Sequence, residues 1–378
     1  ARPVYARWEH VGTGDDAVYV SWHTNGATGY QSSYSGTETY AHNGEGLPRT
    51  EGSLELRHAI HTEVVHDIRA GWDASWVDRG EKQRNLGELR LLWDADESAR
   101  MPGALIEIGF HDHPQDTDAL KEPAFNMLVA RAIYQGIVEY FNPGAPLLPE
   151  PPTHLAVEND GAGRVRVSWR PPMTDGQGLR GDAATGYQVY TSTNGIGWSD
   201  GVSVSSGTEV VLDGLPAGQL LFVRVTATND GGESFPTETL ATRIGDGAEV
   251  LLVNGFDRLN RTMGLYENDP VEGPNVRMLL DLMNRYDYVI QHGEAIDDLA
   301  FDSASNEAVE SDRVDLGDYA VVDWILGEES APDETLSGAE RSRLRRFLES
   351  EGALFISGSE IGWHLVSEGA DPWFYEGL

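Results

Sequence analysis

The first part of the chain alternates short apolar runs with segments whose apolar residues recur at helical spacing. Residues 17–22 and 104–108 are apolar runs of the kind expected for strands buried on both faces of a sheet. Residues 123–141 instead repeat apolar side chains every four positions, and Pro123 suits a first helical turn. A further helix is predicted with a buried stripe of Leu56, Ile60, Val64 and Ile68. We therefore expect an α/β domain over residues 1–144.

A cluster of prolines between residues 143 and 152 predicts an extended, fairly stiff linker at 145–150. After it, apolar and polar residues alternate at 165–169 and again at 223–227, as in strands with one buried face. Glycine and aspartate are frequent between these runs. The pattern predicts a β-sandwich over residues 151–246.

The last third of the chain returns to buried runs separated by helical segments. The predicted strands are 250–253, 319–326 and 354–356, and the predicted helices lie around 276–283 and at 338–350. Ser337 and Glu340 form a capping box for the second helix, and Gly352 fits its end. This order predicts a doubly wound α/β domain over residues 247–378.

Composition limits the possible partners. The chain has 378 residues, 40% hydrophobic content, no cysteine and a formal net charge of −35. Such a charge disfavours nucleic acid and anionic membrane surfaces, which bind through lysine and arginine clusters. No apolar run is long enough for a membrane span. The absence of cysteine excludes disulfides and thiol catalysis.

Two short motifs carry the candidate chemistry of the first domain. Ser21, His23 and Asn25 form a Ser-x-His-x-Asn motif at one predicted strand end, and Glu107 begins a Glu-x-Gly-Phe motif in another. Strand ends are where open α/β sheets usually bind ligands. The pair, together with residues 36–40 between them, resembles zinc-dependent N-acetylmuramoyl-L-alanine amidases.

The resemblance implies a peptidoglycan hydrolase with a Zn²⁺ cofactor. His23 would be a zinc ligand, and Glu107 would be the catalytic carboxylate that acts as base and then as acid. The bond cleaved would join N-acetylmuramic acid to the L-alanine of the stem peptide. Taken alone, His23 is better explained as a polar strand-end residue. Glu107 is harder to explain that way, because burying a carboxylate without a partner is costly.

The same resemblance predicts that part of the site lies upstream. In this family the other two zinc ligands, a His and a Glu, precede the segment that matches residue 1. We therefore expect the chain to be an excerpt of a longer polypeptide, with one of three zinc ligands and little activity by itself. The family implies a secreted or periplasmic protein.

Other polar residues near the motifs have weaker assignments. Asn25, His111 and His113 are candidate substrate-binding residues, although an exposed polar loop is the favoured explanation of the two histidines. Asn25 would either orient His23 or serve a turn after the strand. On the predicted helix around residue 60, the three histidines His58, His61 and His66 lie off the apolar stripe, which indicates a solvated face.

The other two domains also resemble known families. Trp169, Tyr187 and the proline-rich entry are similar to fibronectin type III domains, with Leu221 where a corner tyrosine is common. Residues 247–378 are similar to glutamine amidotransferase-like and ThuA-like domains, which have a flavodoxin-like fold. We expect this domain to be cut short at residue 378. Glu360 stands at the nucleophile position of a Gly-x-nucleophile-x-Gly turn. A carboxylate is a poor nucleophile for glutamine hydrolysis, so a non-catalytic module is expected.

Two alternatives to a peptidoglycan amidase remain open from the sequence. The first is a cell-wall or surface binding protein with a degenerate amidase domain. The second is a zinc carboxypeptidase-like hydrolase acting on free peptides. The oligomeric state is not predicted.

Overall fold

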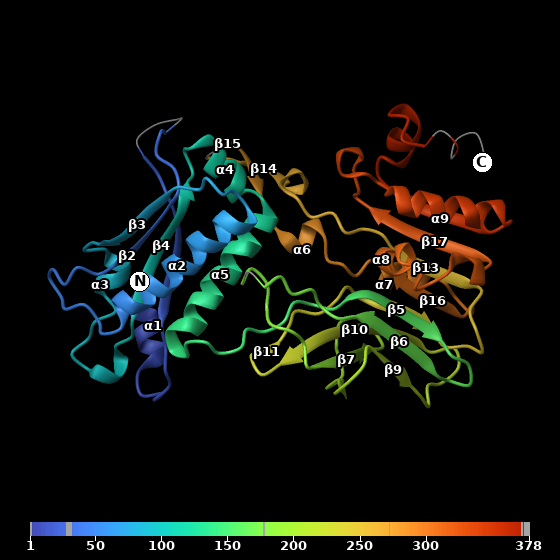
Figure 1. Ribbon diagram of the computed structural model, residues 1–378, viewed down its shortest axis with the longest axis horizontal. Coiled ribbons are helices and arrows are strands. Elements are labelled where there is room, and N and C mark those ends of the chain that lie inside the picture. Colours follow the sequence, from blue (N-terminus) through green and yellow to red (C-terminus); the bar gives the residue numbers. More distant parts are fainter. Residues whose placement is uncertain (1, 28–31, 177, 272, 372, 374–378) are drawn as a thin grey trace. The chain divides into compact units, whose positions relative to one another are not determined.

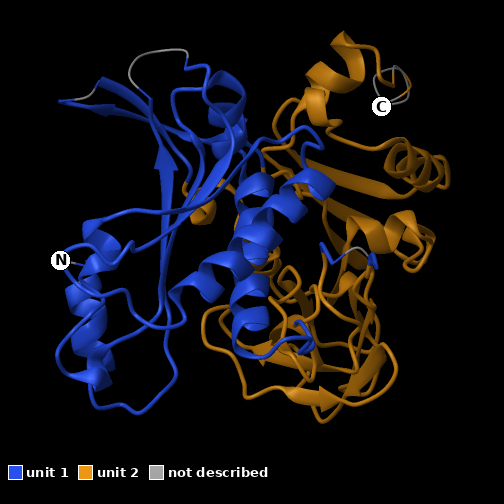
Figure 2. Ribbon diagram, turned by 60° about the vertical axis from the view of Figure 1, so that its left-hand side comes forward, with its two compact units in different colours: residues 1–147, 175–179, 260–278 blue, residues 148–174, 180–259, 279–378 orange. Residues whose placement is uncertain are grey.

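The computed structural model describes residues 2–27, 32–176, 178–271, 273–371 and 373 (Figure 1). The chain forms two compact units (Figure 2). Unit 1 comprises residues 1–147, 175–179 and 260–278, and unit 2 comprises residues 148–174, 180–259 and 279–378. The last five residues of the predicted third domain, 374–378, lie outside the described residues.

Unit 1 is built on a mixed sheet with the strand order β1-β4-β2-β3. Its strands are β1 (Tyr19–Asn25), β2 (Thr37–Ala41), β3 (Asp78–Gln83) and β4 (Gly103–Phe110). Its helices are α1 (Arg2–His10), α2 (Ser53–Gly71), α3 (Gly87–Arg90), α4 (Pro114–Leu120) and α5 (Pro123–Phe141). Strand β4 runs parallel to β1 and antiparallel to β2. The predicted strands and both predicted helices of this part are confirmed.

Helices α2 and α5 lie side by side and cover one face of this sheet (Figure 1). The predicted stripe of α2 is fully buried in this core, together with Ile106 and Ile108 of β4. Gly136 allows the close approach, because a Cβ atom there would lie 2.6 Å from the Cα atom of Ile60. The opposite face carries a smaller apolar cluster that includes Tyr40 and Leu105. Side chains alternate along a strand, so Glu38 and Glu107 also lie on this second face.

Unit 2 contains the predicted β-sandwich. Its strands are β5 (Thr153–Asn159), β6 (Val165–Arg170), β7 (Gly186–Ser192), β8 (Val202–Val204), β9 (Glu209–Leu212), β10 (Leu220–Asn229), β11 (Gly232–Glu233) and β12 (Leu240–Arg243). Strands β5, β6 and β9 pair with one another, and β12, β10, β7 and β8 form the second layer. Trp169 is fully buried between the layers and packs edge-on against Tyr187.

The rest of unit 2 is a parallel sheet flanked by short helices. Its strands are β13 (Val250–Asn254), β16 (Phe301–Ser305), β17 (Val321–Gly327) and β18 (Ala353–Gly358), in the order β18-β17-β13-β16. Its helices are α6 (Leu280–Met283), α7 (Val289–Ala295), α8 (Asn306–Glu310) and α9 (Gly338–Glu349). The predicted capping box of α9 is present.

The sandwich and one face of the parallel sheet of unit 2 share a core, and the other face of that sheet belongs to a second buried cluster. Strand β16 pairs with β13 on one side and with β5 and β12 of the sandwich on the other. Phe301 of β16 and Ile325 of β17 belong to the same buried cluster as Trp169. The sequence predicted two successive domains, whereas these strands form one continuous hydrogen-bonded sheet.

The helix predicted around residues 276–283 is largely wrong. Val276 lies in a hairpin formed by β14 (Leu265–Asp269) and β15 (Gly273–Arg277), and only Leu280–Met283 is helical. Leu280 and Leu282 are exposed. Without a core to bury its apolar residues, a longer helix here has little to stabilise it.

Buried carboxylates in unit 2 predict a measurable effect of pH on stability. Burial raises the pKa of Glu340 to about 7, and burial together with the charge of Glu307 raises the pKa of Glu238. A glutamate in the unfolded chain has a pKa of about 4.3. Between these values the folded state binds more protons, so these groups make stability fall as pH rises. We expect Glu340→Gln, which retains a capping side chain, to gain stability relative to the parent chain from pH 5 to pH 8.

Thermal unfolding of both proteins at constant ionic strength checks this expectation. The difference between them should be small at pH 5 and largest at pH 8. A constant difference across this range would mean that Glu340 does not titrate within it.

Candidate active site

The two sequence motifs meet on neighbouring strands. In the parallel pair β1–β4, His23 is the direct partner of Glu107, and in the antiparallel pair β2–β4 the partner of Glu107 is Glu38. Directly paired residues project from the same face of a sheet, and neighbouring strands lie about 4.8 Å apart. The structure therefore aligns one imidazole and two carboxylates across three strands.

Two atoms in this row are buried without a hydrogen-bond partner. They are Nε2 of His23 and Oε2 of Glu107. Buried polar atoms in folded proteins almost always have partners, so an orphaned pair on adjacent strands needs an explanation. A neutral imidazole nitrogen and a carboxylate oxygen are both good ligands for zinc and similar cations. Among the described residues, no third His, Asp or Glu joins them at ligand distance.

The environment of Glu107 favours its protonated form. Burial, followed by the charges of Glu38 and Glu88, raises the pKa of Glu107 to about 7. A group with a pKa near neutrality can both accept and donate a proton at physiological pH. This is the property that general acid–base catalysis requires.

Glu38 is held ionised next to Glu107. Burial raises its pKa, but hydrogen bonds from Lys82, Tyr40 and Arg79 outweigh that effect, so the pKa lies below its usual value. The Tyr40 hydroxyl donates to Oε1 at 2.7 Å, Arg79 Nε donates to Oε2 at 2.9 Å, and Lys82 also bonds Oε2. Its side chain is 4% exposed. Glu38 thus provides a fixed negative charge at one end of the row, directly beside Glu107.

Glu38 was not identified as a functional residue from the sequence. Its strand, residues 37–41, is fully buried, so a charged side chain in it needs partners. One available signal for a buried acidic partner was Lys82, because lysine is rare in this chain and occurs only at positions 82 and 121. The pairing of Lys82 with Glu38 depends on the crossing from β2 to β3, which local patterns do not reveal.

The candidate substrate-binding residues have specific places around this row. Asn25 donates through Nδ2 to Glu38 Oε1 at 2.7 Å, so it orients Glu38. His111 lies 3.2 Å from the Thr24 hydroxyl through Nδ1, on the exposed loop after β4. His113 is the N-cap of α4, where its side chain accepts from the Asp116 amide. His111 thus borders the strand of His23, whereas His113 holds a helix end.

The histidines of α2 lie apart from this row. His58 and His66 are exposed, as predicted, but His61 is only 6% exposed and bonds Asp78 of β3 at 3.0 Å. The prediction of a solvated face is therefore wrong for His61. The physical reason is that β3 packs beside α2 and covers the flank on which His61 lies.

Comparison with known proteins agrees with the motif pair. Residues 3–139 match the N-acetylmuramoyl-L-alanine amidase family. Residues 150–243 match the fibronectin type III domain family. We refer to residues 3–139 as the amidase-family region. Both motifs, with His23 and Glu107, fall inside it.

Curated relatives give the same picture for the amidase-family region. N-acetylmuramoyl-L-alanine amidase CwlM of Bacillus licheniformis is 30% identical over 141 residues, which are 34% of this chain and 49% of that protein. The sporulation-specific N-acetylmuramoyl-L-alanine amidase of Bacillus subtilis (strain 168) is 32% identical over 124 residues, 33% of this chain and 40% of that protein. The chain thus spans about half or less of these relatives.

Among solved structures, the N-acetylmuramoyl-L-alanine amidase from Clostridium difficile 630 is 25% identical and aligns with a TM-score of 0.29. The alignment covers 37% of this chain and 66% of that one.

Proposed function

We propose that the amidase-family region is part of a zinc-dependent peptidoglycan hydrolase. It would cleave the amide bond between N-acetylmuramic acid and the L-alanine of the stem peptide. The main support is the pairing of His23 with Glu107 on adjacent strands. His23 Nε2 and Glu107 Oε2 are both buried and have no hydrogen-bond partner. The similarity to named amidases supports the choice of substrate.

His23 would hold the zinc ion through Nε2, its unpartnered nitrogen. Zinc, when bound, supplies a Lewis acid that polarises the scissile carbonyl and makes water a nucleophile near neutral pH. His23 is half-buried and projects from the same face of the sheet as Glu107.

Glu107 would move the proton. In its ionised form Oε2 accepts a proton from the attacking water, and the protonated acid then donates it to the leaving amine of L-alanine. Glu38 assists by keeping the pKa of Glu107 near neutrality, through its negative charge on the adjacent strand. Asn25, Tyr40, Arg79 and Lys82 hold Glu38 in place.

Digestion of purified peptidoglycan by the full-length protein tests the function. The expected products are intact glycan strands and free stem peptides with an N-terminal L-alanine, and a zinc chelator should abolish their release. Binding to peptidoglycan without release would favour the alternative of a degenerate, non-catalytic amidase domain. Hydrolysis of free peptides alone would favour a carboxypeptidase-like enzyme.

The pH profile of this activity tests the role of Glu38. If ionised Glu107 is the base, kcat/KM rises with pH as Glu107 ionises and then levels off. Bound Zn²⁺ would favour the ionised carboxylate, so the midpoint should lie below the pKa of about 7 that burial, Glu38 and Glu88 give Glu107 without metal. Glu38→Gln removes the adjacent negative charge and leaves Arg79 and Lys82 without their carboxylate. Both changes lower the pKa of Glu107, so the midpoint should move to lower pH by on the order of one pH unit.

Glu88→Gln serves as a graded control for this shift. Glu88 also raises the pKa of Glu107, but less than Glu38 does, so its variant should shift the midpoint in the same direction by a smaller amount. An unchanged midpoint in Glu38→Gln would show that the rise of kcat/KM with pH does not reflect the ionisation of Glu107.

We propose that the β-sandwich and the parallel-sheet region of unit 2 are non-catalytic. The order β18-β17-β13-β16 fits a doubly wound, flavodoxin-like sheet of the amidotransferase-like or ThuA-like kind. Glu360, at the nucleophile position, has a φ of 55°, as a strained strand-to-helix elbow requires. Its carboxylate accepts hydrogen bonds from the Ala331 amide and the Ser330 hydroxyl, which lower its pKa. It therefore caps a neighbouring turn.

The proposed substrate implies action in the cell wall, so we propose a secreted or periplasmic protein. In the described parts of the chain, no helix has both the length and the apolarity to cross a membrane.

A further inference from the structure

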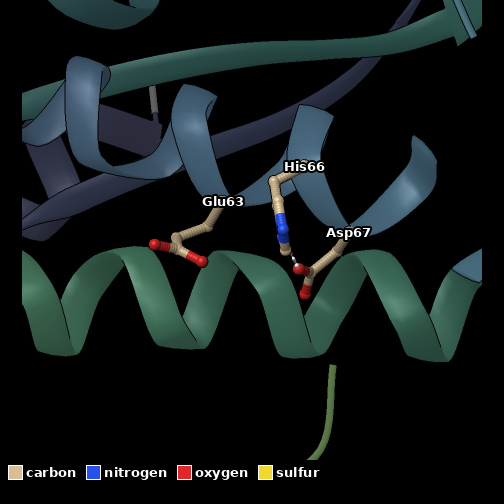
Figure 3. Close-up of side chains that lie close together, drawn as sticks. All are labelled: Glu63, His66 and Asp67. Carbon is tan, nitrogen blue, oxygen red and sulfur yellow. Dashed lines mark hydrogen bonds and ion pairs between the residues drawn. The ribbon is translucent and has the colours of Figure 1, made fainter. Parts of the chain in front are cut away.

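A second group of ligand-type side chains lies on α2, outside the row of His23 and Glu107. Glu63, His66 and Asp67 occupy one helical turn, and their ligand atoms lie within 4.8 Å of one another. Figure 3 shows the three side chains projecting from the same side of the helix, toward α5. Positions i, i+3 and i+4 of a helix share a face, so this convergence is built into the helix.

Asp67 is the unusual member of this group. Its side chain is fully buried, and its Oδ2 atom has no hydrogen-bond partner. Its Oδ1 atom accepts from Nδ1 of His66 at 2.9 Å. A fully buried carboxylate with one bare oxygen is costly unless a positive charge neutralises it. The bare oxygen therefore indicates a missing cationic partner.

The surrounding charges increase this need. Burial, with Glu63 and Asp175 as further contributors, raises the pKa of Asp67 to about 6 against the opposing effect of His66. Burial and the charge of Glu139 likewise raise the pKa of Glu63, and His66 again opposes them. Carboxylates thus disfavour the ionised forms of both Glu63 and Asp67, and His66 opposes this effect at each of them.

We propose that Glu63, His66 and Asp67 bind a divalent transition-metal ion, at a site separate from the proposed catalytic centre. One imidazole and two carboxylates form a ligand set that suits Zn²⁺ and similar ions and is less suited to Ca²⁺, which prefers oxygen alone. The 2.9 Å between His66 Nδ1 and Asp67 Oδ1 is close to the separation of about 3.0 to 3.4 Å expected for two ligands with bonds near 2.1 Å. Exposed His66 gives the ion a path from solvent.

The site has a structural role. Helix α2 packs on both α5 and the sheet that carries His23 and Glu107. A metal ion on this turn neutralises the carboxylates that otherwise destabilise the helix, and stabilises the scaffold of the amidase-family region by binding only the folded state.

Titration of the full chain with Zn²⁺ alone tests the proposal, in a His23→Ala/Glu107→Gln background that removes the other zinc-binding candidates. Isothermal titration and the rise in melting temperature with Zn²⁺ are both measured. The background protein should bind one ion per chain. Adding Asp67→Asn should weaken binding more than about 100-fold, beyond the loss typical of groups that only orient a ligand.

Asp67→Asn also separates a metal site from a structural carboxylate. If Asp67 is a ligand, the variant should melt at a higher temperature than its parent without metal, because a buried charge is removed, and should lose the Zn²⁺-induced rise. Lower stability without metal, together with retained Zn²⁺ binding, would overturn the proposal.

Two further measurements identify the ligands. His66→Ala should lose Zn²⁺ binding, whereas His58→Ala, an exposed histidine two turns away on the same helix, should retain it. Co²⁺ bound at the site should give visible absorption bands that His66→Ala abolishes. Ca²⁺ binding of equal strength that survives His66→Ala would replace this proposal with an acidic surface site.

Discussion

Replacing Glu107 with glutamine should reduce peptidoglycan hydrolysis by about 10²- to 10⁴-fold, the range that a positioned general acid–base group contributes. Glutamine has nearly the same shape but neither accepts a proton from water nor donates one to the leaving amine. The assay is the release of stem peptides by the full-length protein.

The same substitution should not unfold the protein. Burial raises the pKa of Glu107, and its Oε2 atom has no partner, so a neutral amide removes an unfavourable ionisation at neutral pH. We expect an unchanged or higher melting temperature at pH 7. Glu97→Gln, an exposed glutamate in the same unit, should retain full activity. Full activity in Glu107→Gln would remove the proposed proton-transfer role.

Replacing Phe301 with alanine should destabilise all of unit 2, at a cost of about 3–5 kcal/mol. Phe301 is fully buried in the core that the sandwich and the parallel sheet share. It lies on β16, which pairs with strands of both parts. Hydrogen exchange should therefore increase together in β10 of the sandwich and in β17 of the parallel sheet.

Phe355 provides the matched control, because it lies on β18 of the same sheet but is 58% exposed. Phe355→Ala should change the free energy of unfolding by no more than about 0.5 kcal/mol, as is usual for surface positions. If Phe301→Ala increased exchange in β17 and left β10 unaffected, the sandwich would be an independent folding unit.

Much of the secondary structure could be predicted because each element depends on nearby residues. The stripe from Leu56 to Ile68 repeats at helical spacing and is buried as predicted. The capping box of Ser337 and Glu340 also formed, since both partners lie within one helical turn. The helix predicted around Val276 failed because most of its apolar residues, including Val276, Leu280 and Leu282, are exposed. A hairpin formed over part of it.

Some residues of the candidate site could be identified from the sequence, and others could not. His23 and Glu107 could be selected from their motifs, because each motif is a short run on one strand. The role of Glu38 could not, because its contacts with Arg79 and Lys82 arise only after β2 and β3 pair. The buried state of His61 likewise depends on β3, which lies outside its helix.

The sequence by itself determined the α/β and β-sandwich regions, the two motifs and the negative net charge, because these follow from residue type and local spacing. Tertiary structure decided which distant residues share a surface. The order β1-β4-β2 aligned His23, Glu107 and Glu38, and the pairing of β16 joined two regions that the sequence separates. Strand pairing joins residues far apart in the chain, so it leaves no mark on the local pattern of either strand.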